Sequence, residues 1–156
     1  MGAKNRLICG VILCGAVLGI AIAPPRAVSR AEQEAEEPVP AFHAEAPRGQ
    51  IPETLSPSEF TDIVVQNAYV LAARVKKILY QQPCYCHCDR SQGHTSLLDC
   101  FASKHGSNCG VCMREAIYSY EQSHKGKTAT QIRAGIERGE WREVDMSKYA
   151  VPVAAK

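Results

Sequence analysis

Six cysteines lie between residues 84 and 112 of this 156-residue chain. Thiolates bind soft metal ions, and thiols also form and exchange disulfides. The set therefore predicts sulfur chemistry, and its members are the candidates both for metal ligands and for disulfide partners. They are Cys84, Cys86, Cys88, Cys100, Cys109 and Cys112.

The first three of these cysteines alternate with other residues. In an extended segment the side chains of Cys84, Cys86 and Cys88 face the same way, roughly 7 Å apart. Disulfide geometry is narrow, so neighbours in a C-x-C sequence pair with each other only under strain. The three thiols therefore need partners elsewhere in the chain.

Cys109 and Cys112 offer such partners. A helix is expected to begin at this point with Asn108 as its cap, which places the two thiols in the first turn and on one face. The helix dipole and the free backbone N–H groups there stabilise thiolates. The loop around Cys86 and the start of this helix are thus expected to form the two sides of one site.

Three uses of the cysteines remain open. The favoured one is a soft-metal site for Cu(I), or second for Zn(II), because thiolate-rich sites select these ions. The second is a set of three structural disulfides, for which six cysteines allow 15 connectivities. The third is a redox couple of Cys109 and Cys112, although the strand that usually precedes a redox C-x-x-C is missing.

Three histidines lie near the cysteines. His87, between two cysteines, and His94, just before a helix start, are predicted as additional metal ligands. His105 is a further plausible ligand by its position, but it is expected to contact helix carbonyls or water. Neither a Ser/His/Asp set nor an H-E-x-x-H motif occurs, so the sequence does not indicate an enzyme.

The N-terminal residues have the pattern of an export signal. Lys4 and Arg6 precede an uncharged run from Leu7 to Ala23, which fits a cleaved signal peptide or a retained membrane anchor within residues 1–31. Residues 32–54 are rich in Pro, Glu and Ala and are expected to be a disordered, flexible linker. We therefore expect the protein to be exported to the periplasmic or cell-envelope side, where disulfides are favoured.

The remaining sequence predicts an all-α domain at residues 55–142, followed by a tail at 143–156. A capping box at Ser56–Glu59 and apolar residues at helical spacing predict a helix of about 25 residues that Pro83 ends. Shorter helices are expected around Leu97–Phe101, after Asn108, and after Thr128, where a second capping box lies. The fold class is thus a small bundle of three to four helices with an irregular Cys-rich loop.

The net charge of +2 and the scattered basic residues give no indication of nucleic-acid binding. The expected partners are a metal ion and, if the N-terminal segment is retained, a membrane.

The cysteine segment resembles the bacterial PCYCGC-motif family of exported proteins and lipoproteins. The resemblance covers roughly residues 57–138 and is carried by Pro83–Cys88, by Leu97–Phe101 and by Cys109–Cys112. It implies an envelope location and a metal or thiol role. His87 stands where the motif has glycine, and the lipoprotein signal common in the family is not evident here.

Overall fold

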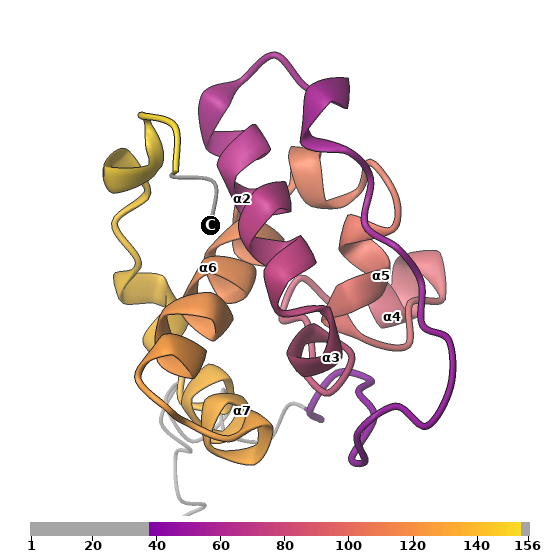
Figure 1. Cartoon of the computed structure of the whole chain (residues 1–156). Helices are drawn as coiled ribbons and strands as arrows, with labels where there is room; N and C mark the ends of the chain where they lie inside the picture. Colours follow the sequence, from indigo (N-terminus) through magenta and orange to yellow (C-terminus); the bar gives the residue numbers. More distant parts are fainter. Residues whose placement is uncertain (1–37, 154–156) are drawn as a thin grey trace, which may run out of the picture. The chain divides into compact units, whose positions relative to one another are not determined.

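Helix α6 (Gly110–His124) lies at the centre of the molecule and packs against α2, α3, α5 and α7 (Figure 1). The computed structural model describes residues 38–153, and within them every regular element is helical. The all-α prediction is therefore confirmed. The predicted signal peptide or anchor (residues 1–31) and the linker residues 32–37 lie outside the described residues. No helix within residues 38–153 is both long and apolar enough to cross a bilayer.

The prediction of one helix of about 25 residues after Ser56 is wrong. Ser56 caps only a 3-10 turn, η1 (Pro57–Glu59), and α2 (Ile63–Arg74) begins separately at Asp62. The carboxylate of Asp62 accepts hydrogen bonds from two N–H groups of the first turn, which is a stronger cap than the upstream pattern provides. The chain then turns at Val75, and α3 (Lys76–Leu79) follows as a short separate helix.

The cysteine-rich region is more regular than expected. Residues 88–92, predicted as part of an irregular loop, form a short helix, α4 (Cys88–Gln92). Helix α5 (Leu97–Phe101) confirms the predicted helix there, and four of its five residues are buried. A 3-10 turn, η2 (Gly106–Asn108), leads into α6. Asn108 therefore does not cap α6, which has Cys109 in the N-cap position.

The last helix agrees with its prediction. Helix α7 (Ala129–Glu137) begins with the full capping box of Thr128 and Gln131 and buries Ile132, Gly135 and Ile136. Two further 3-10 turns follow, η3 (Glu140–Glu143) and η4 (Met146–Tyr149). Trp141 in η3 is buried, as expected of an anchor.

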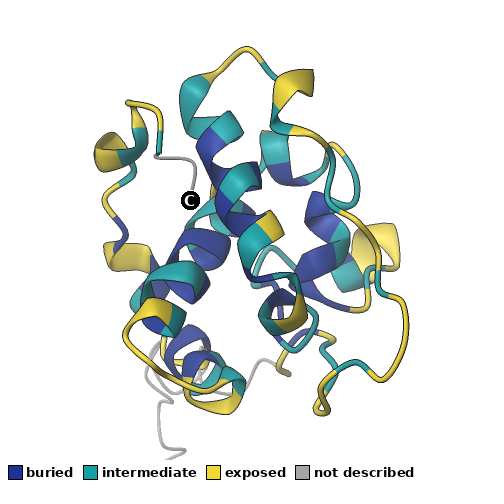
Figure 2. Cartoon of the chain, viewed as in Figure 1, coloured by how far each residue is buried: buried dark blue, intermediate teal, exposed yellow. Residues whose placement is uncertain are grey.

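The core lies where α2, α3, α5, α6 and α7 face one another (Figure 2). The C-terminal residues are held to this core by Asn67 of α2, whose side chain donates to the carbonyls of Tyr149 and Val151 at 2.7 Å each. Residues 38–54 form no helix or strand, yet they run alongside α3, α4 and α5 (Figure 1).

Candidate metal centre

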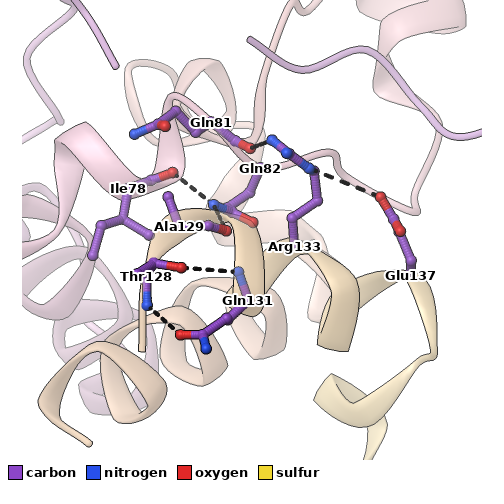
Figure 3. Close-up of polar contacts among 8 residues, drawn as sticks. All are labelled: Ile78, Gln81, Gln82, Thr128, Ala129, Gln131, Arg133 and Glu137. Atoms are coloured by element: carbon purple, nitrogen blue, oxygen red, sulfur yellow. Dashed lines mark hydrogen bonds and ion pairs between the residues drawn. The ribbon is translucent and has the colours of Figure 1, made fainter. Parts of the chain in front are cut away.

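The segment that carries the first cysteines is fixed at its start by Gln82. This fully buried side chain donates to the carbonyls of Ile78 (3.1 Å) and Ala129 (3.2 Å), which joins α3 to α7 (Figure 3). The backbone carbonyl of Gln82 accepts from the N–H of Leu97 at 2.9 Å, at the start of α5. The position of Cys84, two residues later, is therefore set by three helices.

The C-x-C segment is fixed a second time by Glu115 of α6. Its Oε1 accepts a hydrogen bond from the backbone N–H of Tyr85 at 2.9 Å, between Cys84 and Cys86. Glu115 is fully buried, and burial raises the pKa of its carboxyl to about 8. A group with no sequence signal of its own thus holds the cysteine loop on α6.

The thiols meet in two sets of contacts. Cys84, Cys86 and Cys112 form a triangle with Sγ–Sγ distances of 3.3, 3.4 and 3.5 Å. Cys88 and Cys100 form the second contact, at 3.4 Å. The cysteine loop and α6 therefore do lie on two sides of one cluster, as predicted, and α5 supplies a further thiol.

Ligand distances divide this cluster into two groups. The inner group is Cys84, Cys88 and Cys100, and the outer group is Cys86, His105, Cys109 and Cys112; within each group the ligand atoms all lie within 4.8 Å of one another. Either group has the size and donor set that a single metal ion requires. The outer set of three cysteines and one histidine also has the composition of a structural zinc site.

All six cysteines of this cluster are free thiols, and the described residues contain no disulfide. The neighbouring thiols, with Cys100 and Cys112 foremost, lower the pKa of Cys86. Interactions with the neighbouring thiols, with Cys112 foremost, raise the pKa of Cys100. The thiols of the metal-free cluster therefore titrate as one coupled set.

The histidines differ from their predicted roles. His105 was expected to contact carbonyls or water, but its Nε2 lies 3.6 Å from Cys86 Sγ, so this prediction is wrong. The tight approach of η2 to α5 places it there: a Cβ on Gly106 would lie 2.9 Å from the carbonyl oxygen of Cys100. The sequence offered His105 only as one more nearby ligand, because its contact with Cys86 depends on how η2 packs.

His94 lies beside the inner group, with its Nδ1 3.3 Å from Cys100 Sγ. Burial lowers the pKa of His94, which favours the neutral imidazole that ligates metal. His87 belongs to neither group, and its ring lies edge-on to Tyr85 instead. Its role as a ligand remains a prediction.

His87 also has an unusual backbone conformation. It is the one non-glycine residue with positive φ among residues 38–153, at φ 55°. Only glycine adopts this region without steric cost. The position where the resembling motif carries glycine is thus the position where the chain must turn left-handed before α4.

A protein-family model agrees with this assignment of the cysteine motif. The model described as "Protein of unknown function with PCYCGC motif" matches residues 43–152. Neither a curated protein nor a solved structure matches the chain.

Proposed function

Since this chain belongs to the PCYCGC family, whose description assigns no function, we propose that it binds a soft metal ion outside the cytoplasm, Cu(I) in preference to Zn(II), for handling, storage or sensing. The observation that supports this proposal is the convergence of six free thiols and two imidazoles from α4, α5, α6 and the segments that precede them.

The choice of metal rests on the donor atoms. Thiolates are soft ligands that select Cu(I) and Zn(II) over harder ions. The inner group offers three sulfurs. A structural zinc site has four ligands, so this three-coordinate thiolate set suits Cu(I) better than Zn(II). The outer group suits either ion, which is why Zn(II) stays the second choice.

The location of the protein is part of the proposal. A positively charged start followed by the uncharged run from Leu7 to Ala23 supports export. An oxidising compartment favours disulfides among closely spaced thiols. A bound metal ion would protect them, because coordinated thiolates are not free to pair with each other.

Metal content and thiol state, measured together on protein from its native compartment, test the proposal. We expect copper or zinc to copurify and all six cysteines of the cluster to alkylate after chelation and unfolding, as read by peptide mass spectrometry. Cys84→Ser should lower the metal content, because Cys84 contacts both Cys86 and Cys112.

The matched control is His124→Gln, since His124 lies at the far end of α6 and contacts the carbonyl of Tyr120. This variant should keep the full metal content. Three disulfides without metal in protein from the native compartment would overturn the proposal in favour of a disulfide-stapled module.

A further inference from the structure

The two thiol groups differ in their access to solvent. The three thiols of the inner group are at most 2% exposed. Three of the four residues in the outer group are partly exposed: Cys86, His105 and Cys109. An ion in the outer group would therefore be within reach of external ligands, and an ion in the inner group would not.

A segment from the N-terminal side covers the inner group. We name residues 38–43 the N-terminal strap. Pro40 of the strap is fully buried and lies with Ala41 over Cys84 and Cys88. The gap between them is too small for a water molecule. An ion held by the inner group would therefore be bound by protein atoms alone, without a water ligand to exchange.

The strap is tied down at several points. The N–H of Ala41 donates to Asp89 Oδ2 at 3.2 Å, next to Cys88 in the chain. The ring of His43 stacks on Tyr80 with 3.9 Å between centroids. Arg133 of α7 lies over the ring of Phe42 at 4.4 Å. Opening the inner group requires these contacts to break together, so opening is expected to be slow.

The two groups are nevertheless in contact with each other. Cys84 of the inner group lies 3.3 Å from Cys86 Sγ and 3.4 Å from Cys112 Sγ, both in the outer group. A thiolate at Cys84 can therefore bind an ion that the outer group still holds. This contact provides a path between the two groups, which an ion can follow in either direction when the strap loosens over Cys84 and Cys88.

We propose that the cluster binds two ions with different exchange rates: the outer group takes up and releases its ion, and the inner group receives an ion through Cys84 and retains it beneath the N-terminal strap. The inference rests on the proposed metal binding. Transfer changes only the ligands. Each inner thiol that binds the ion releases its proton, each outer thiolate that lets go regains one, and the oxidation state of Cu(I) is unchanged.

The test measures removal of Cu(I) from the loaded full-length protein by the chromogenic chelator bathocuproine disulfonate, without oxygen. We expect two bound ions and two phases of equal amplitude, which differ in rate by at least about tenfold because the inner ion waits for local opening. Cys109→Ser should remove the fast phase and slow the loading of the inner group. Cys88→Ser should remove the slow phase alone.

The strap is tested without changing a ligand. Asp89→Ala removes the acceptor of the Ala41 N–H and should accelerate the slow phase about tenfold, with the stoichiometry unchanged. The matched control is Glu53→Gln, which removes the ion pair with Lys76 farther along the same segment. This control should leave both phases as they are. Far-UV circular dichroism of the metal-free variants shows whether each has folded.

The outcomes separate the two proposals. A protein that binds neither copper nor zinc refutes the proposed function. Binding of one ion, release of two ions in one phase, or a slow phase that Asp89→Ala does not change in a folded protein would overturn this inference. In each of these last cases the proposed metal binding would still stand.

Discussion

The inner and outer thiol groups share a contact at Cys84 but belong to different parts of the molecule. Cys100 of the inner group lies on α5, among Leu97, Leu98 and Phe101 in the core. Cys109 of the outer group precedes α6 and is partly exposed. The same residue type is thus placed in a rigid and dry environment on one side and in an accessible one on the other. Burial therefore distinguishes the two groups more clearly than their ligands do.

The largest expected difference is in stabilisation by metal. Each bound Cu(I) should raise the free energy of unfolding by about 4 kcal/mol when the free ion exceeds its dissociation constant a thousandfold. At one free-ion concentration Cys100→Ser should lose more stabilisation than Cys109→Ser, because the ion that the inner group retains is expected to have the lower dissociation constant. Denaturant unfolding of loaded and chelated protein measures the gain for each variant. Equal losses of stabilisation in the two variants would mean that the inner and outer groups do not differ in how strongly their ions stabilise the fold.

The metal-free protein offers the next test. Phe101→Ala removes a fully buried ring beside Cys100 and should cost about 3–5 kcal/mol of stability. Val111→Ala, next to Cys112 but only partly buried, should cost less than about 1.5 kcal/mol. Urea unfolding under reducing, metal-free conditions gives both values. If Val111→Ala lowered the stability more than Phe101→Ala, the main hydrophobic core would lie on the side of the outer group.

Glu115 serves both groups through one hydrogen bond. Glu115→Ala leaves the N–H of Tyr85 without its acceptor and should cost about 1–3 kcal/mol. Glu115→Gln keeps an acceptor oxygen and should cost less. The comparison by chemical denaturation is made on chelated protein, and metal stoichiometry is measured in parallel. A glutamine variant as unstable as the alanine variant would mean that this hydrogen bond does not hold the loop.

The smallest effect is expected at His87. A left-handed backbone disfavours any residue with a Cβ, so His87→Gly should be about 1 kcal/mol more stable than His87→Ala. Both variants lack the imidazole, so their metal content should be the same. If His87 is a ligand, as the sequence suggests, both variants should bind less metal than the parent. If it is not, their metal content should match that of the parent.

The helices that could be read from sequence were those with complete local signals. The capping box at Thr128 and the apolar spacing of Ile132 and Ile136 defined α7 correctly, since both signals agree within a few residues. The same kind of signal at Ser56 was misleading, because Asp62 provides a competing cap and the chain turns at Val75. Helix boundaries depend on such competition, which spacing alone does not show.

The sequence by itself indicated that the cysteine loop and the start of α6 lie on two sides of one cluster. Close spacing and helical periodicity are properties of the local sequence, so they can be recognised without knowing how distant segments pack. The tertiary structure alone decided that the set divides in two, that His105 joins it, that Glu115 supports it and that the strap covers one half. These features arise from packing between segments far apart in the chain, and no local pattern specifies which side chains such packing brings together.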